Sequence, residues 1–242
     1  MRHLLLKEIA SFFNSLVAYI VIVVFLAGIG LISWVFPQTS ILEYGFAGID
    51  PLFNTAPYVF MFLIPAITMR TFAEEYKAGT IELLLTRPIS DLQIVLGKYL
   101  ASVVLVIIAL LPTLTYYYTV YNLGAPQGNI DTAAVAGSYI GLILLGAVFT
   151  SIGIFASSLT DNQIVAFIIA VFFCFCLYDG FSAIASINVW ASYAYYISQL
   201  GIDFHYASVS RGLLDIRNII YFISLITIMV FLTKLSLESR KW

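Results

Sequence analysis

The sequence predicts an all-α integral membrane protein with six membrane-spanning helices. Of its 242 residues, 62% are hydrophobic and only 10% are charged, whereas a soluble domain carries roughly 25% charged residues. Uncharged runs recur that are long enough for a spanning helix, which needs about 20 apolar residues. Lys and Arg collect in alternate loops, which gives all the runs one consistent orientation. These observations favour a single membrane domain over residues 1–242.

Residues 1–14 predict a short amphipathic helix that lies along the membrane interface. Leu5, Ile9 and Phe12 share one face of this helix. Charged residues supply the other face: Arg2, Lys7 and Glu8. The alternative is an extended first spanning helix. A cleavable signal peptide is not expected, because the apolar run continues to residue 42.

Six uncharged runs predict the spanning helices, at residues 16–36, 51–70, 98–121, 135–158, 162–180 and 217–237. The stretch between the last two, residues 181–216, is rich in Ser, Tyr and Ala. It is too long for a hairpin and too polar to span the bilayer. We therefore expect short interfacial or re-entrant helices there, on the outer side of the membrane.

The positive-inside rule decides the orientation of these helices. With the N-terminus inside, nine Lys and Arg residues fall on the inner side: Arg2, Lys7, Arg70, Lys77, Arg87, Lys98, Lys234, Arg240 and Lys241. Two fall on the outer side, Arg211 and Arg217. We therefore expect both termini in the cytoplasm.

The segment between the second and third spans, residues 70–91, combines many charges with strong helix start and stop signals. Arg70–Ala78 continues the second helix, and Gly79 is well placed to end it. Thr80 can cap a short helix that ends at Pro88. Residues 90–93 then form a capping box, with a hydrophobic staple between residues 89 and 94, where the third helix begins. Such an ordered polar segment is typical of an element presented to a cytoplasmic partner.

The residues of this segment also resemble a known family. The pattern R-T-F-A-E-E-Y-K-A-G-T-I-E-L-L-L-T-R-P-I-S, followed by V-L-G-K-Y-L-A, is similar to the signature of type-2 ABC transporter permeases. A second motif, H-Y-A-S-V-S-R-G-L-L-D-I-R-N-I-I-Y-F, resembles the branch with gliding-motility-associated and nitrous-oxide-maturation permeases. Length and sequence are most similar to the gliding-motility permease subunit.

The resemblance implies that residues 70–91 contain a coupling helix that docks on a separate ATP-binding subunit. Its docking residues and their supports would be Arg70, Glu74, Glu75, Gly79, Thr80, Glu82, Leu83, Leu84, Leu85, Arg87 and Pro88. The alternative is that the acids only solvate a cytoplasmic helix. The resemblance also implies a bacterial inner-membrane exporter, linked to gliding motility, with a second permease copy or a related membrane subunit.

No phosphate-binding loop is present in the chain. The one Gly-Lys pair, Gly97-Lys98, is preceded by Leu92 where such a loop needs Gly and followed by Tyr99 where it needs Ser or Thr. We therefore expect a non-catalytic subunit without a cofactor of its own, with ATP and Mg²⁺ bound by the partner.

Asp179 is the one acid near a spanning helix and is a candidate for a transport path. The uncharged residues from Asn162 onward reach about 26 Å, so Asp179 can instead lie at the outer interface. Further along, charged residues that we expect on the outer side can form ion pairs or meet another protein: Asp203, His205, Arg211, Asp215 and Arg217.

Other classes of function receive less support from the sequence. An ion-coupled secondary carrier needs acids or histidines near the bilayer centre, and a membrane scaffold could use residues 70–91 only as a dock. Cys174 and Cys176 face different directions on a helix, and His3 and His205 are expected on opposite sides, so no metal site is predicted. The net charge of −2, without a basic run, argues against nucleic-acid binding.

Overall fold

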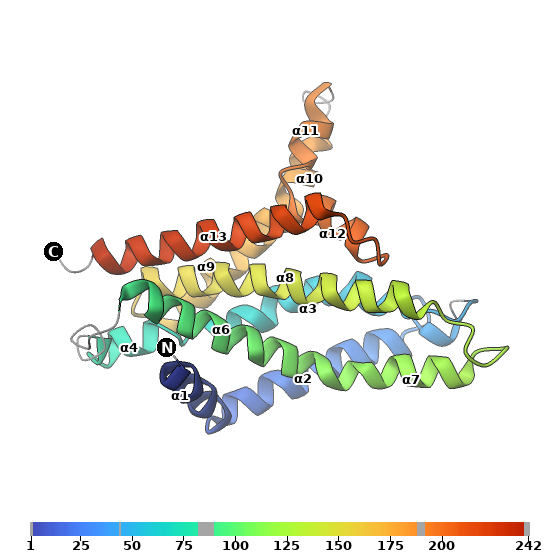
Figure 1. Cartoon of the computed structure of the whole chain (residues 1–242), viewed down its shortest axis with the longest axis horizontal. Coiled ribbons are helices and arrows are strands. Elements are labelled where there is room, and N and C mark those ends of the chain that lie inside the picture. The colour runs from blue at the N-terminus through green and yellow to red at the C-terminus, as the bar shows by residue number, and fades with distance from the viewer. Residues whose placement is uncertain (1, 44, 82–89, 188–191, 240–242) are drawn as a thin grey trace.

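The computed structural model describes residues 2–43, 45–81, 90–187 and 192–239. Over these residues the chain is helical with no strand, which confirms the predicted all-α class. The helices form an elongated bundle (Figure 1). We call the end where both termini and α4 lie the termini end. The opposite end, which carries the loops after α2 and α7, is the loop end.

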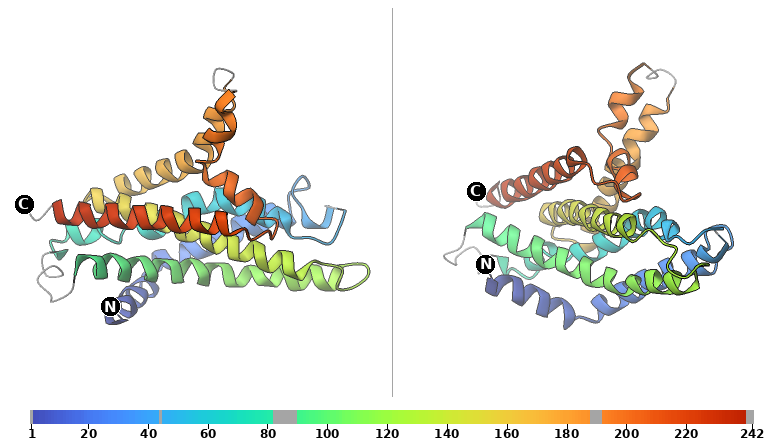
Figure 2. Two further views of the ribbon diagram at one scale, coloured as in Figure 1. Left: turned by 45° about the horizontal axis from the view of Figure 1, so that its top comes forward. Right: turned by 45° about the vertical axis from the view of Figure 1, so that its right-hand side comes forward.

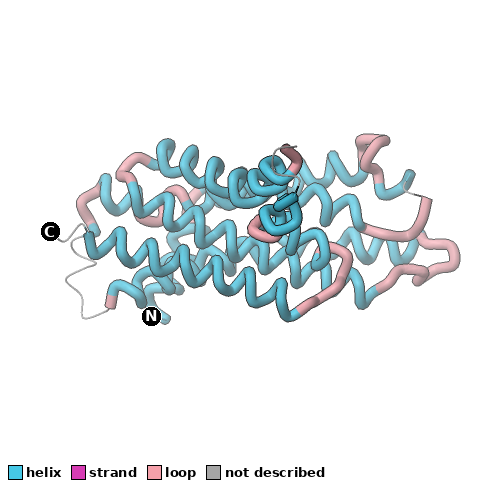
Figure 3. Tube along the Cα trace, turned by 90° about the horizontal axis from the view of Figure 1, so that it is seen from above, coloured by secondary structure: helices cyan, strands magenta, loops and turns pink. Residues whose placement is uncertain are grey.

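The elements follow one another along the bundle as α1 (Arg2–Phe13), α2 (Leu16–Trp34), η1 (Ile41–Glu43), α3 (Asp50–Thr68), α4 (Ala73–Lys77), α6 (Asp91–Leu110), η2 (Leu111–Thr113), α7 (Leu114–Leu123), α8 (Thr132–Leu159), α9 (Gln163–Phe175), η3 (Cys176–Gly180), α10 (Phe181–Ala185), α11 (Ala194–Ser198), α12 (Ile202–Val209) and α13 (Ile216–Ser239). Figure 3, seen from above, shows the long helices running alongside one another.

Five helical stretches of the described chain are long and apolar enough to cross a membrane: Asp50–Lys77, Asp91–Leu123, Thr132–Leu159, Gln163–Ala185 and Ile216–Ser239. A sixth candidate is the pair of α1 and α2, which meet at a bend of 70°. This bend separates α1 from α2 at Asn14 and Ser15, so the two do not form one straight helix. The count of five or six agrees with the multi-pass protein that the sequence predicts.

The core of the bundle is α8, which packs against α3, α6, α9 and α13. Of its most apolar stretch 78% is buried, against 17% for α13, so α8 is central and α13 peripheral. Small residues permit close packing here: a Cβ atom at Gly153 would collide with the Thr68 side chain. Because a membrane supplies little hydrophobic drive between helices, such close approach is a main source of their association.

Three boundaries differ from the sequence-based expectation. The second helix does not continue unbroken to Ala78, because a turn at residues 69–72 separates α3 from α4. The third helix begins at Asp91, as the capping box predicts, and extends past the expected residue 121 to Leu123 through a 3₁₀ turn that contains Pro112. The fifth passes through one π-helical turn, η3, which includes Asp179, and continues through α10 to Ala185.

The region predicted at residues 181–216 contains three short helices in its described part. α10 and α11 pack against each other and project sideways from the bundle (Figure 2). α12 instead packs against α8, α13 and η3. Because the Tyr206 hydroxyl donates a 2.8 Å hydrogen bond to the Phe53 carbonyl, α12 is also tied to α3.

Candidate functional site

At the termini end, a side chain of the central helix holds the break between α3 and α4. The Ser157 hydroxyl accepts hydrogen bonds from the backbone N–H groups of Phe72 and Ala73, both at 3.1 Å. The same hydroxyl donates to the Met69 carbonyl at 3.0 Å. A helix break leaves backbone groups without intrahelical partners, and leaving these buried would cost free energy. Ser157 therefore fixes α4 directly to α8.

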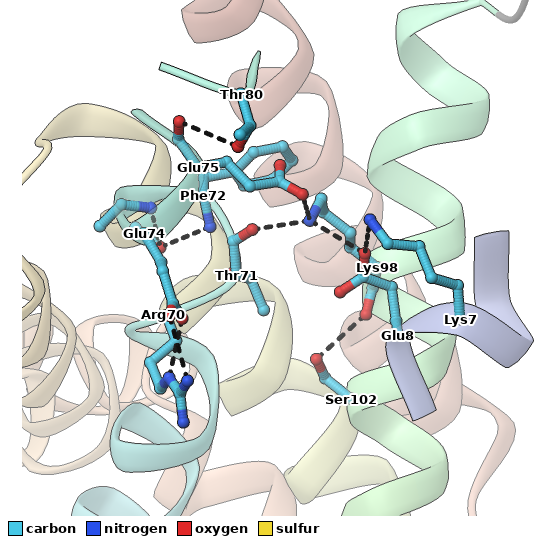
Figure 4. A network of polar contacts seen from close by, with 12 residues as sticks. Lys7, Glu8, Arg70, Thr71, Phe72, Glu74, Glu75, Thr80, Lys98 and Ser102 are labelled. Carbon is cyan, nitrogen blue, oxygen red and sulfur yellow. Dashed lines mark hydrogen bonds and ion pairs between the residues drawn. The ribbon is translucent and has the colours of Figure 1, made fainter. Parts of the chain in front are cut away.

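The second anchor of α4 is Lys98, whose side chain is only 1% exposed. Its ammonium lies 2.9 Å from the Glu75 carboxylate and 3.3 Å from that of Glu8 (Figure 4). It also donates to the Thr71 carbonyl at 2.7 Å and lies 5.1 Å from the centre of the Phe72 ring. A buried ammonium is tolerated only when it is paired and hydrogen-bonded, and Lys98 meets both conditions.

These contacts join α1, α4 and α6. Glu8 lies on α1, Glu75 on α4 and Lys98 on α6, so a single ammonium connects all three. We call Glu8, Thr71, Phe72, Glu75 and Lys98 the Lys98 network. The pairing also explains why Lys98 is buried near the end of a membrane helix, where a lysine would otherwise extend to water.

Arg70 adds a further link between α4 and the start of the chain. Its guanidinium donates to both carboxylate oxygens of Glu74, at 2.8 and 3.1 Å, and to the Ser15 hydroxyl at 2.6 Å. Ser15 lies in the turn between α1 and α2. Arg70 therefore connects this turn to the first residues of α4 by planar, two-oxygen recognition of a carboxylate.

The end of α4 follows the sequence-based expectation. Gly79 has a φ of +66°, a left-handed conformation that favours glycine. The Thr80 N–H donates to the Glu75 carbonyl at 3.0 Å, and the Gly79 N–H to the Tyr76 carbonyl at 3.1 Å, which resembles a Schellman ending. The predicted capping box is also confirmed, since Ser90 and Gln93 exchange side chain-to-backbone hydrogen bonds.

The described docking candidates face two directions. Glu74 is 48% exposed and faces outward beside Arg70, whereas Glu75 is 17% exposed and faces the Lys98 network. Gly79 and Thr80 are exposed at the end of α4. The remaining candidates lie outside the described residues: Glu82, Leu83, Leu84, Leu85, Arg87 and Pro88. Residue 89 of the predicted staple lies outside them as well.

Sequence reasoning missed the roles of Lys98 and Ser157. Lys98 marked only the limit of an apolar run, and Ser157 lies inside one. The sequence did contain one signal for Lys98: it lies seven residues after Asp91, where the capping box starts the helix. Such a position is already inside the helix, and a lysine there needs a nearby carboxylate.

The predicted ion pairs of the charged cluster near the loop end do not form. No ion pair joins residues 201–217, all of which the structure describes. His205 instead has its ring nitrogens 2.8 Å from the Asn218 side-chain oxygen and 2.9 Å from the Gln199 carbonyl. Its ring also stacks on Tyr221 at 3.8 Å between centroids. Hydrogen bonding and stacking therefore hold α12 to α13.

Asp179 lies in the π-helical turn and is partly buried, on a different element from every residue of the Lys98 network. The termini end thus contains the described docking candidates, while Asp179 belongs to a different element, next to Tyr178.

A comparison with protein families gives one match: the family described as ABC-2 family transporter protein matches residues 37–241. No curated protein sequence matches the chain. The match covers every long helix except α1 and α2.

Proposed function

Because the chain belongs to the ABC-2 family of transporter proteins, we propose that it is the permease subunit of an ATP-driven exporter that docks a separate ATP-binding subunit at α4 and residues 78–91. The family indicates the membrane component of an ABC transporter, and the apolar helices make it a multi-pass membrane protein. The permease performs no bond chemistry itself. ATP and Mg²⁺ bind the partner, and the permease converts its movement into a change of helix packing.

The observation that carries this proposal is the rigid mounting of a short, exposed helix. α4 presents Glu74 and Lys77 to solvent, while Ser157 and Lys98 hold its inner side. A helix that only solvated a loop would need neither anchor. A partner that pushes on α4 therefore moves α1, α6 and α8 with it.

This arrangement supports a two-state mechanism. Docking energy can shift helix packing only if the partner contacts α4 differently in its nucleotide-bound and nucleotide-free states. The Lys98 network and the Ser157 hydrogen bonds make the contact between α4 and the bundle stiff. The displacement is then passed to the central helix rather than lost in a flexible loop.

The distribution of basic residues supports the cytoplasmic placement of the termini end. The elements of this end carry most of the basic residues: Lys7 lies on α1, Arg70 pairs with Glu74 of α4, Lys77 ends α4, Lys98 pairs with Glu75 of α4, and Lys234 lies in the C-terminal part of α13. By the positive-inside rule, this end faces the cytoplasm and both termini lie there.

The same orientation places the loop end and the projecting α10–α11 pair on the outer side. Exposed tyrosines at this pair, Tyr193, Tyr195 and Tyr196, suit a position at the membrane interface. The resemblance of residues 70–101 and 205–222 to type-2 permeases supports a bacterial inner-membrane exporter linked to gliding motility. It also supports a second permease copy or a related membrane subunit in the complex.

Co-purification with the ATP-binding subunit encoded beside this chain tests the docking surface. Glu74→Lys reverses an exposed charge that pairs with Arg70 four residues earlier. The matched control is Glu238→Lys on α13, which pairs with Lys234 in the same spacing and is 42% exposed. Both variants should fold, because exposed ion pairs contribute only about 0.2–1 kcal/mol.

We expect the ATP-binding subunit to co-purify with wild type and with Glu238→Lys, and to be lost from Glu74→Lys. Equal recovery with all three would remove α4 from the docking surface. If the subunit binds but its ATP hydrolysis is unchanged by the permease, the chain is a scaffold and not a pump.

A further inference from the structure

A polar cavity of 710 Å³ lies between α3, η3 and α12, toward the loop end of the bundle. Its lining includes Asp50, Asn54, Tyr58, Tyr178, Asp203 and Arg211. Ligand-binding cavities in proteins commonly measure about 300–1,000 Å³. None of the five residues of the Lys98 network, all of which the structure describes, lines this cavity.

Tyr178 is a deeply buried polar residue in the lining of this cavity. Its side chain is only 3% exposed, and its ring packs against Phe149, Tyr206 and Tyr58 at centroid distances of 6.1, 6.3 and 6.0 Å. Among the described residues no hydrogen-bond partner of its hydroxyl is found, in contrast to the hydroxyl of the neighbouring Tyr206. This hydroxyl is not among the fully buried side-chain atoms that lack a partner, so it is accessible from the cavity, where a ligand can supply its hydrogen bond.

The carboxylates of the cavity are also unmatched. Asp50 and Asp203 line it from α3 and α12, and neither forms an ion pair with a described residue. Asp179 follows Tyr178 directly in η3 and adds a further acid next to the lining. The one cation in the lining, Arg211, is exposed and donates its Nε–H to the Ala207 carbonyl at 3.1 Å. The cavity therefore has an excess of negative charge.

Tyrosine rings accompany these carboxylates. Tyr58 is half-exposed beside Tyr178, so the cavity combines ring surfaces with acids. An ammonium group is attracted to such rings as well as to carboxylates. A bare divalent ion is a poorer match, since Ca²⁺ takes 6–8 oxygen ligands and two carboxylates line this cavity.

We propose that this cavity binds a ligand through an organic ammonium group. Asp50 and Asp203 hold the charge, the Tyr58 and Tyr178 rings cover it, and the Tyr178 hydroxyl donates to or accepts from the polar remainder of the ligand. Binding needs no ATP-binding subunit, so the test is independent of the function proposed above.

The probe is spermidine, titrated by calorimetry into the purified chain in nanodiscs of zwitterionic phosphatidylcholine. We expect saturable binding to wild type and none of 1,8-octanediol, a neutral chain of similar length. Asp203→Asn should weaken binding about tenfold and Tyr178→Phe about fivefold, because these remove one charged and one neutral hydrogen-bonding group.

Asp131→Asn is the matched control. Asp131 caps α8 at the loop end, where its side chain accepts from the Ala134 N–H at 3.0 Å, and it does not line the cavity. Asn caps a helix about as well as Asp, so folding is preserved while the same charge is removed. We expect spermidine affinity within about twofold of wild type, since an exposed charge outside the lining is screened by salt.

The proposal fails if wild type shows no saturable spermidine binding, or if Asp203→Asn and Tyr178→Phe bind as wild type does. It also fails if Mg²⁺ displaces spermidine at equal concentration, because the site would then select charge and not an organic cation.

A parallel titration with an octalysine peptide distinguishes the two possible sources of the ammonium group, a protein side chain and a free small molecule. Tighter binding of the peptide, weakened by the same variants, assigns the ammonium to a protein side chain. Tighter binding of spermidine assigns it to a free small molecule.

Discussion

The two ends of this bundle treat buried charge in opposite ways. At the termini end, the Lys98 ammonium is surrounded by Glu8, Glu75 and the Thr71 carbonyl, so the positive charge is fully matched within the chain. Toward the loop end, Asp50 and Asp203 line a cavity and form no ion pair with a described residue, although Arg211 also lines it. The charges at the termini end are paired within the chain, whereas the cavity carboxylates near the loop end have no ion-pair partner among the described residues.

This difference in pairing indicates a structural role for the Lys98 network and a ligand-binding role for Asp50 and Asp203. Removing one member of a matched buried set leaves an uncompensated charge, which is strongly destabilising. Removing an acid that forms no ion pair leaves no partner uncompensated. Asp50 and Asp203 also lie in the first turns of α3 and α12, where the helix dipole stabilises negative charge. This explains how the acids are tolerated without a ligand, but not why they border a cavity.

The largest effect is expected from Lys98→Met. This substitution leaves Glu75 without a cation, leaves Glu8 with only the exposed Lys7 at 3.9 Å, and removes the donor to Thr71. We expect a loss of about 3–5 kcal/mol in the free energy of unfolding, measured by denaturant titration in detergent. Adding Glu75→Gln should recover part of the loss, because it removes one uncompensated carboxylate.

Lys234→Met is the control for this prediction. Lys234 forms an ion pair with Glu238 at 3.3 Å, but its side chain is half-exposed. Its loss should cost below about 1 kcal/mol. Equal effects of the two lysine variants would show that the Lys98 network does not stabilise the termini end.

A smaller but distinct loss is expected from Ser157→Ala. Two buried N–H groups lose their acceptor, which should cost about 2 kcal/mol in the free energy of unfolding. The neighbouring Ser158 is equally buried, yet its hydroxyl donates only to the Phe155 carbonyl of its own helix at 2.7 Å. Ser158→Ala should therefore cost well below half as much, and the same denaturant titration compares the two.

The local parts of the termini end could be predicted from the sequence. The capping box needs only Ser90 and Gln93, three residues apart, and the end of α4 needs only Gly79. Long uncharged runs likewise predict membrane helices, because the bilayer fixes the required length. In each case the signal and the structure it specifies lie within one segment of the chain.

The anchors of α4 could not be predicted in this way. Ser157 is 85 residues from Phe72, and Lys98 is 90 residues from Glu8, so both contacts depend on how the helices pack. The break at residues 69–72 contains no Gly or Pro to mark it. The π-helical turn at Tyr178 and Asp179 carries no periodic signal either, and it is this turn that contributes Tyr178 to the cavity.

The smallest effect on stability is expected from Asp203→Asn. Because Asp203 forms no ion pair with a described residue, its neutralisation should change the free energy of unfolding by less than about 0.5 kcal/mol. Thermal unfolding in detergent compares this variant with wild type. A loss as large as that of Ser157→Ala would mean that the loop-end acids, like Lys98, are structural.

The most direct test of the account is cysteine cross-linking to the ATP-binding subunit, in a chain with Cys174 and Cys176 replaced by alanine. Lys77→Cys places a thiol on exposed α4, and Leu213→Cys places one at an exposed position near the loop end. Docking at the termini end predicts a cross-link from position 77 and none from position 213. A cross-link from position 213, or none from position 77 in a complex that still co-purifies, would contradict the proposed docking surface.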